Sequence, residues 1–383
     1  MCESCYEYRN ADGDYSYTYL NGSNKVSSIR TNNDYLDYYY GATVGYKFRR
    51  KVKLKVGYKT SSIDQGLPGA VILYNETADE RLYTNDHILF SDGVFMLDKI
   101  YFRVHGKLNL NKMTYTDPSF LNNENGIDVD YQNKSVSMGF SFISDFNNRF
   151  QLSGGMEQQV NSLNSSDTLF AEPTRYHNFG LLGLKFKTQN FNFITQLSSQ
   201  YVSERNENGK SAGDKFELNP LIKIETRAVG KHKIKQQLWY RNSFRMPTFN
   251  ELYYNNIGNT LLNPEKANQF NYTITLTTKI TNKMKLFCNS NLYFNRVHDR
   301  IVAIPTMNLF VWSMQNIGIT NTYGGDVTLK IVNEFSSKMK MVFYVNYTYN
   351  KTIDVTYELE PTYGDQVAYI PLHTANIDFS MHY

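Results

Sequence analysis

The most regular feature of the sequence is an alternation of apolar and polar side chains over stretches of about ten residues. In residues 52–59, Val52, Leu54 and Val56 share one phase, while lysines fill most of the other phase. The same period of two recurs at residues 37–48, 100–110, 135–143, 269–278 and 339–350. Because successive side chains of a strand point to opposite faces, this pattern predicts β-strands that each carry one apolar face.

The connections between these predicted strands alternate between short and long from residue 37 onward. Long polar segments are expected at 60–86, 111–133, 160–177, 203–214, 242–268, 295–321 and 351–372. A soluble sandwich and a membrane barrel share the alternation within strands. The rhythm of connections is typical of outer-membrane barrels, which have short periplasmic turns and long extracellular loops. The sequence therefore predicts an all-β fold, an antiparallel transmembrane β-barrel whose apolar side chains, such as Leu54, face lipid.

Composition supports a membrane barrel over an ordinary soluble protein. The chain contains 31 Tyr and 24 Phe, only 20% of its residues are charged, and yet its mean hydropathy is −0.50. No run of about 18 apolar residues predicts a transmembrane helix. A barrel reconciles these values because its strands distribute apolar residues in alternation. The net charge of +4 is small and the Lys and Arg residues are dispersed, so we expect no nucleic-acid partner.

The N-terminal residues give three expectations. A short hairpin is predicted where alternating tyrosines precede the turn Asn21-Gly22. Cys2 and Cys5 lack a second pair at zinc spacing, so we interpret them as incidental residues at a frayed terminus. No basic and apolar leader follows Met1, so we expect the export signal of an outer-membrane protein to lie upstream, in a longer chain.

Residues 243–269 interrupt the alternation with a stretch of strong local character, SFRMPTFNELYYNNIGNTLLNPEKANQ. Pro247, Pro264 and several Asn and Gly residues argue against a regular helix or a central strand. Clean alternation lies on both sides of the stretch. We therefore expect a long loop that joins two strands.

This stretch resembles a box of the TonB-dependent outer-membrane receptors, which reads roughly Phe-Arg-Ala-Pro-Thr-Phe-x-Glu-Leu-Tyr and then Gly-Asn-Pro-x-Leu-x-Pro-Glu. Here Met246 stands in place of the Ala, and Thr260 in place of the Pro after Gly-Asn. Weaker matches lie at 66–69, 316–318, 324–326 and 371–373. The resemblance spans most of the chain but concerns only the barrel part of the family.

The resemblance implies a larger protein than the sequence supplies. Plugged transporters of this kind have about 22 strands, whereas about 15 to 16 strands can be counted here. The implied plug domain and TonB-contacting segment are not recognisable, so residues 1–383 are expected to form a partial barrel with strands missing at the C-terminal end. Such receptors sit in the bacterial outer membrane, among its lipids. They bind an extracellular metal chelate or cofactor such as a ferric siderophore, haem or cobalamin, and import it with the TonB complex.

Two roles are open for the box. In the structural role, aromatic residues pack beneath the loop, the prolines fix its path, and Arg245 pairs with Glu251 or Glu265. In the functional role, the loop contacts ligand at the extracellular mouth, and two tyrosines are the expected contacts because aromatic rings offer large contact area at low entropic cost. The structural residues are Phe244, Arg245, Pro247, Phe249, Glu251, Pro264 and Glu265, and the ligand-contacting residues are Tyr253 and Tyr254.

Catalytic, metal and cofactor sites are not indicated by the sequence. The seven histidines are dispersed, and neither an H-E-x-x-H spacing nor a G-x-S-x-G elbow is present. We therefore expect a receptor or transporter without enzymatic activity. A porin-like or adhesin-type barrel without TonB coupling is the alternative. A membrane-bound enzyme barrel would need a catalytic cluster facing the lumen.

Overall fold

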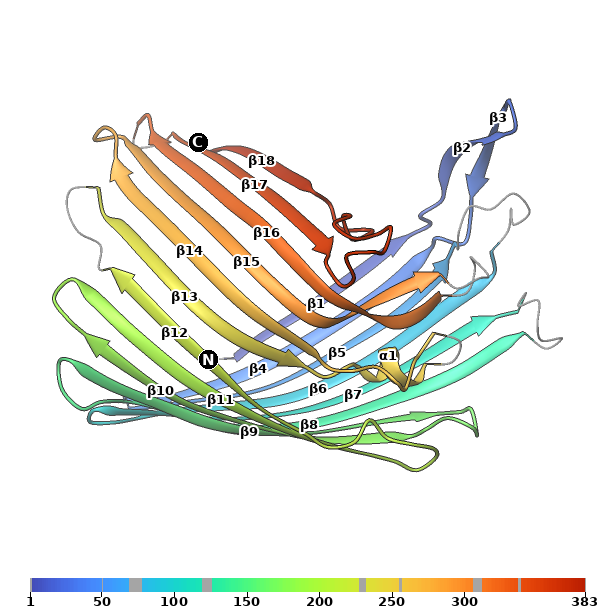
Figure 1. The fold of residues 1–383 in the computed structure, drawn as a ribbon, viewed down its shortest axis with the longest axis horizontal. Coiled ribbons are helices and arrows are strands. Elements are labelled where there is room, and N and C mark those ends of the chain that lie inside the picture. Colours follow the sequence, from blue (N-terminus) through green and yellow to red (C-terminus); the bar gives the residue numbers. More distant parts are fainter. Residues whose placement is uncertain are drawn as a thin grey trace. The chain divides into compact units, whose positions relative to one another are not determined.

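The computed structural model describes residues 2–49, 51–68, 78–118, 126–226, 232–254, 257–305, 312–336 and 339–382. Within these residues, 16 strands form one antiparallel sheet in the order β1-β4-β5 and then consecutively to β18, and β2 pairs with β3 in a separate hairpin (Figure 1). The predicted all-β fold and the strand number are confirmed. No helix in the described chain is long and apolar enough to cross a bilayer.

The elements have the following bounds: β1 Cys2–Ala11, β2 Tyr15–Asn21, β3 Asn24–Arg30, β4 Tyr35–Phe48, β5 Val52–Leu67, β6 Glu80–Leu97, β7 Ile100–Asp117, β8 Ile127–Asp145, β9 Phe150–Ser165, β10 Pro173–Lys187, β11 Phe191–Asn206, β12 Lys215–Thr226, β13 Ile234–Arg245, α1 Phe249–Tyr253, β14 Glu265–Lys279, β15 Met284–Pro305, β16 Trp312–Glu334, β17 Lys340–Asp354 and β18 His373–His382. The chain divides into two compact units. Unit 1 contains 1–142, 155–179 and 201–215, and unit 2 contains 143–154, 180–200 and 216–383.

In unit 1, strand register gathers the apolar phase of several strands on one face. Val44 lies opposite Val56, Tyr58 lies opposite Leu89, and Leu89 lies opposite Leu108. Leu89 is 48% exposed although it lies in the middle of a strand. Exposed aliphatic side chains on a continuous sheet face are what a lipid-facing surface requires. We call this face the apolar belt of unit 1; it contains Val44, Leu54, Val56, Leu89 and Val104.

The opposite face of unit 1 is polar, as the alternation predicts. Lys53 lies opposite Lys47 and Val94, and Lys55 lies opposite Asp92. Arg103 forms an ion pair with Asp92, with its Nη2 at 2.6 Å from the carboxylate oxygen. A hydrated interior lined by charged groups is the usual complement of a lipid-facing apolar exterior.

In unit 2, a row of aromatic rings crosses four neighbouring strands. Tyr240, Phe270, Phe294 and Tyr323 lie opposite one another in the register of β13 to β16. Their ring centroids are separated by 4.9, 6.4 and 5.0 Å in that order. Rings at a common height on one sheet face fit the aromatic girdle of a membrane interface.

The strands are longer than the alternation predicts. Strand β15 runs for 22 residues to Pro305, whereas the sequence predicts that this strand ends near residue 294. Strand β6 begins at Glu80 and not near residue 87. In β15 beyond residue 294, residues 295–300 place polar side chains in both phases and residues 301–304 place apolar side chains in both, so the period of two disappears while the backbone ladder continues. The long connections are correspondingly shorter than expected.

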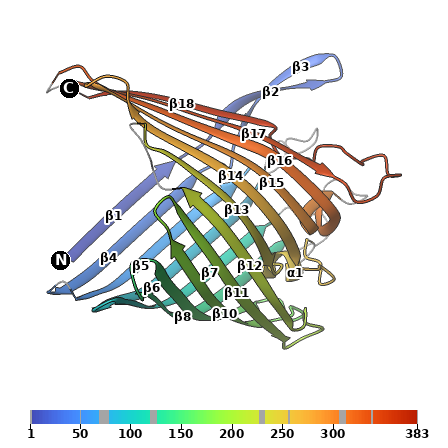
Figure 2. The ribbon, with the colours of Figure 1, turned by 60° about the vertical axis from the view of Figure 1, so that its left-hand side comes forward.

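Two expectations about local structure are wrong. Cys2 and Cys5 do not lie in a frayed terminus, because β1 pairs along its length with β4. The stretch 243–269 contains a helix, α1, between its two prolines. The hairpin predicted around Asn21-Gly22 is confirmed as β2 and β3, which stand beyond the ends of β1 and β4 (Figure 2).

Candidate functional site

The box begins with a capped helix. Thr248 is the N-cap of α1, and its hydroxyl accepts a hydrogen bond from the backbone N–H of Glu251 at 3.3 Å. The Glu251 carboxylate in turn accepts one from the backbone N–H of Thr248 at 2.7 Å. This reciprocal capping box satisfies two backbone donors at the helix start and makes a helix of one turn possible. Its signature, Thr248-x-x-Glu251, is present in the sequence, although Pro247 and Pro264 on either side of it favour a loop over a helix.

Arg245 is the centre of an ion-pair network that joins three elements. Its Nε donates to Glu265 at 2.7 Å, and its Nη1 donates to Glu251 at 2.9 Å. Glu265 also accepts a hydrogen bond from the backbone N–H of Ile301 at 2.7 Å. The guanidinium therefore connects the end of β13, the helix α1 and the start of β14, and Glu265 extends the connection to β15.

The electrostatic state of Glu251 follows from these contacts. Burial alone would raise the pKa of its carboxyl, but hydrogen bonds from Arg245 and from the Thr248 backbone outweigh burial. The pKa of Glu251 is therefore held below its ordinary value of 4.5. The carboxylate is ionised at neutral pH and its charge is compensated locally.

Beneath the network, apolar side chains of the box form a small core. Leu252 is 1% exposed, and the side chains of Phe244, Phe249 and Pro247 are buried. Tyr253, expected to contact ligand, is only 7% exposed, and its ring centroid lies 6.2 Å from that of Phe249. Tyr254 and Pro264 are half-buried, so of the two tyrosines Tyr254 presents more surface.

Asparagine side chains fasten the second half of the box to β15 and β16. The Asn259 side-chain amide donates to the Met314 carbonyl at 2.9 Å, and the Met314 N–H donates to the Ile257 carbonyl at 3.0 Å. The Asn316 side chain accepts from the Asn263 N–H at 2.8 Å and donates to the carbonyl of Asp299 at 2.6 Å. These contacts were not predicted, because the partners of Asn259 and Asn263 lie more than fifty residues away in the sequence.

Gly258 allows the chain to return closely over the helix. A Cβ atom at this position would lie 2.8 Å from the backbone carbon and oxygen of Leu252 and from the nitrogen of Tyr253. Backbone atoms cannot yield as a flexible side chain would. The Gly-Asn pair of the box is therefore explained by packing against α1.

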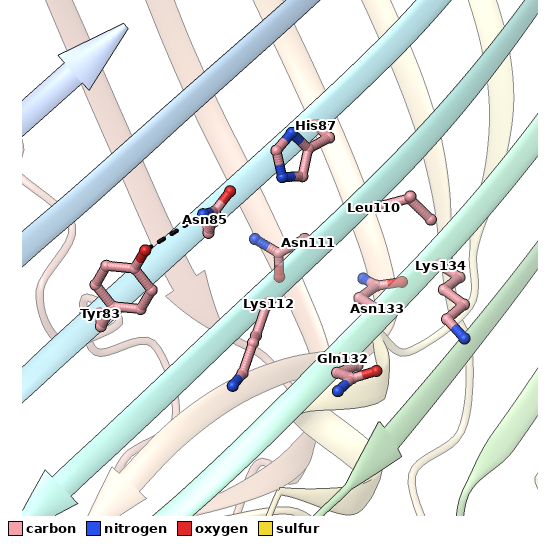
Figure 3. A pocket seen from close by; sticks show the side chains of 9 residues that line it. All are labelled: Tyr83, Asn85, His87, Leu110, Asn111, Lys112, Gln132, Asn133 and Lys134. Atoms are coloured by element: carbon pink, nitrogen blue, oxygen red, sulfur yellow. Dashed lines mark hydrogen bonds between the residues drawn. The ribbon is translucent and has the colours of Figure 1, made fainter.

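A second feature is a hollow of about 510 Å³ on unit 1. It is lined by side chains from three adjacent strands, β6, β7 and β8 (Figure 3): Tyr83, Asn85, His87, Leu110, Asn111, Lys112, Gln132, Asn133 and Lys134. Most of the lining residues are of polar type and two are lysines, but the surface they present to the hollow is mainly apolar, and none of them was singled out from the sequence. No cluster of three or more His, Cys, Asp or Glu side chains suited to a metal ion occurs in the described parts of the chain.

Comparison with known proteins gives a family match for the C-terminal part of the chain. Residues 234–383 match a family described as TonB dependent receptor-like, beta-barrel. No curated protein matches the chain. The resemblance inferred from the box is thus confirmed for residues 234–383, which include the whole box.

Solved structures share the fold at low identity. The FrpB iron transporter from Neisseria meningitidis (F3-3 variant) has a TM-score of 0.70 at 12% identity, covering 99% of this chain and 62% of its own. The copper transporter OprC has a TM-score of 0.66 at 11% sequence identity, and the match covers 91% of this chain and 62% of the OprC chain. A double mutant of the Serratia marcescens hemophore receptor HasR, in complex with HasA and heme, has a TM-score of 0.67 at 11% sequence identity. The match covers 91% of this chain and 63% of the HasR chain. The chain therefore spans less than two thirds of the length of these proteins, and the shared fold is that of their β-barrel.

Proposed function

We propose that the chain forms much of the barrel wall of a bacterial outer-membrane receptor that imports a scarce nutrient with energy delivered through TonB. The observation that carries the proposal is the family match over residues 234–383, in a sheet whose fold recurs in an iron transporter, a copper transporter and a hemophore receptor. The nutrient is a metal chelate or cofactor of the ferric siderophore, haem or cobalamin type. The TonB complex acts through a part of the receptor outside residues 1–383.

The strand directions of unit 2 bring the box and other connections to one end. Because β13 to β18 are successively antiparallel, the connections 246–264 and 355–372 lie at the same end of the strands, opposite the turns 280–283 and 335–339 (Figure 2). Exposed apolar and aromatic groups occur there, including Leu261 and Tyr369, which are 86% and 84% exposed. Trp312 lies against Tyr369 with ring centroids 5.8 Å apart. We assign this end to the cell exterior, where such groups serve ligand capture.

Tyr254 and Tyr253 remain the proposed ligand contacts of the box. The exposure of Tyr254 favours it as the direct contact, whereas Tyr253 is buried near the ring of Phe249. Truncating a central aromatic contact costs about 2 kcal/mol or more of binding free energy, which is roughly a thirtyfold loss of affinity. Tyr254→Phe keeps the ring and is the matched control, since it removes only the hydroxyl.

The test is an uptake assay on cells that express the intact receptor, with and without functional TonB. Cells are supplied in turn with ⁵⁵Fe-loaded siderophore, haem and labelled cobalamin. TonB-dependent accumulation of one of these probes is expected. Equal accumulation with and without TonB would instead support the porin-like or adhesin-type barrel. If Tyr254→Ala binds the imported probe as tightly as the wild-type receptor, the ligand contact assigned to the box is refuted while the transport function stands.

A further inference from the structure

The outer part of β16, residues 312–319, touches both the box and the connection between β17 and β18. On the box side, the Asn316 side chain accepts a hydrogen bond from the Asn263 N–H at 2.8 Å and donates one to the Asn263 carbonyl at 3.1 Å. On the other side, the Val355 N–H donates to the Ile319 carbonyl at 2.9 Å. We call this segment the spine, because one stretch of strand supports two connections that are far apart in the sequence.

Gly318 makes room for the second of these supports. A Cβ atom at this position would overlap Cγ2 of Thr356 and would lie 2.9 Å from its hydroxyl oxygen. Thr356 is β-branched and has few allowed orientations about its first side-chain torsion, so it does not yield as a long flexible side chain would. The Thr356 side chain therefore sits directly on the backbone of the spine, and a larger residue in place of Gly318 would displace it.

The Thr356 hydroxyl fixes this contact. It accepts a hydrogen bond from the Ile319 N–H at 2.9 Å and donates one to the Asp354 carboxylate at 2.5 Å. The same carboxylate oxygen accepts a hydrogen bond from the backbone N–H of Thr356 at 2.9 Å. The hydroxyl thus uses both its donor and its acceptor capacity, so a single orientation of the side chain satisfies all of these groups.

Beyond Thr356, the connection folds back along β17 and returns to the spine. The Val367 N–H donates to the Thr352 carbonyl at 2.8 Å, which holds the returning chain beside β17. Tyr369 then lies against Trp312, at the start of the spine, with ring centroids 5.8 Å apart. The seat of Thr356 on the spine therefore helps to fix where the exposed Tyr369 ring lies.

We propose that Thr356 is a positioning residue for nutrient capture, which holds the connection 355–372 at a set distance from the box through the spine. The inference rests on the proposed function, in which exposed side chains of both connections contact the nutrient. A nutrient that is gripped from two sides needs both sides in place, and the apparent affinity falls with the fraction of receptor in which one side is misplaced. The proposal also explains two residues of the motif at 316–318, since its asparagine holds the box and its glycine seats Thr356.

The relative position of the two connections is measured by electron–electron distance between spin labels on the intact receptor, freed of its native cysteines. The labels are carried by Thr260→Cys in the box and Leu359→Cys in the connection, because both side chains are exposed. We expect one narrow distance distribution in the otherwise wild-type receptor. Thr356→Val keeps the shape of the side chain but removes the hydroxyl, so it should broaden the distribution. Thr356→Ser keeps the hydroxyl and should restore the narrow distribution.

Thr328→Val is the matched control for the lost hydroxyl. Thr328 lies on the same strand, outside the spine, and its hydroxyl donates to the Asn346 side chain at 2.8 Å. The control should leave the distance distribution narrow, and hydrogen exchange at residues 355–367 should be faster in Thr356→Val than in the control. Distributions of equal width in Thr356→Val and Thr328→Val would overturn the proposal.

Uptake by cells separates positioning from assembly. Cells are supplied in turn with ⁵⁵Fe-loaded siderophore, haem and labelled cobalamin. For the probe that the wild-type receptor accumulates, Thr356→Val should raise the half-saturating concentration about fivefold, the effect of about one hydrogen bond, and leave the maximal rate unchanged. A lower maximal rate at an unchanged half-saturating concentration would overturn the positioning role. If the wild-type receptor accumulates none of the probes, the proposed function fails, while the label distances still decide whether Thr356 holds the two connections.

Discussion

Replacing Arg245 by Ala removes a group that, among the described residues, is alone in touching both carboxylates of the box. The Arg245 side chain is 41% exposed, while the side chains of Glu251 and Glu265 are only 17% and 19% exposed. A buried charge-assisted hydrogen bond contributes about 1.5–3 kcal/mol. Solvent screening at the exposed part of the guanidinium reduces each ion pair to about 1 kcal/mol. Since Glu251 and Glu265 keep their backbone donors, we expect Arg245→Ala to lower the unfolding free energy by about 2 kcal/mol, a factor of about 30 in the equilibrium.

The assay is urea unfolding of the intact receptor, with the folded fraction read from heat-modifiability gels. Arg241→Ala is the matched control, because Arg241 lies on the same strand, is exposed and forms no ion pair within the described residues. That control should change the unfolding free energy by less than about 0.5 kcal/mol. Arg245→Lys keeps the positive charge but loses the planar guanidinium that bonds both carboxylates, so its unfolding free energy should fall between those of Arg245→Ala and Arg241→Ala. An Arg245→Ala protein as stable as the Arg241→Ala protein would refute the structural role of the network.

Two further predictions concern the same region. Because the folded pKa of Glu251 is depressed below 4.5, its stabilising contribution is complete above that pH and is lost as the pH falls through the folded pKa. Urea unfolding at descending pH should show this loss of stability, and the Glu251→Gln variant should lack this pH dependence. A Glu251→Gln variant with the same pH profile as the wild-type receptor would contradict the assignment. Gly258→Ala should destabilise the receptor by about 1–3 kcal/mol because its Cβ meets the α1 backbone. Gly106→Ala, whose Cβ meets only the Ser91 hydroxyl at 3.3 Å and more distant atoms, should cost less in the same unfolding assay.

The sequence predicted the parts of this fold whose faces differ in polarity. Leu54 and Lys55 lie on opposite faces as their alternation requires, and the short connections fall where polar residues break that alternation. Strand ends were missed where the two faces no longer differ in polarity, as in β15 beyond residue 294, where both faces are first polar and then, at residues 301–304, apolar. There the ladder is held by backbone hydrogen bonds, which leave no pattern in side-chain polarity.

The candidate site was predicted where its contacts are local and missed where they are distant. Arg245 and Glu251 are six residues apart, and their pairing was weighed from the sequence alone. The contacts of Asn259 with Met314 and of Asn263 with Asn316 depend on the register of β14, β15 and β16. A single sequence does not give that register at the required precision. The hollow on β6 to β8 was missed for the same reason, since its lining comes from three strands.

The contacts that hold the box in place do not depend on any ligand. Its arginine, glutamates, prolines and glycine hold a capped helix between β13 and β14, and its asparagines fasten the following chain to β15 and β16. None of these roles requires a particular ligand, because each partner belongs to the barrel itself. Under the proposed function, selectivity for a nutrient is assigned to side chains that leave this framework, such as Tyr254 and Leu261. It follows that exchanging these side chains should alter which nutrient is captured, while exchanging Arg245 should weaken capture of every nutrient by loosening the loop that presents them.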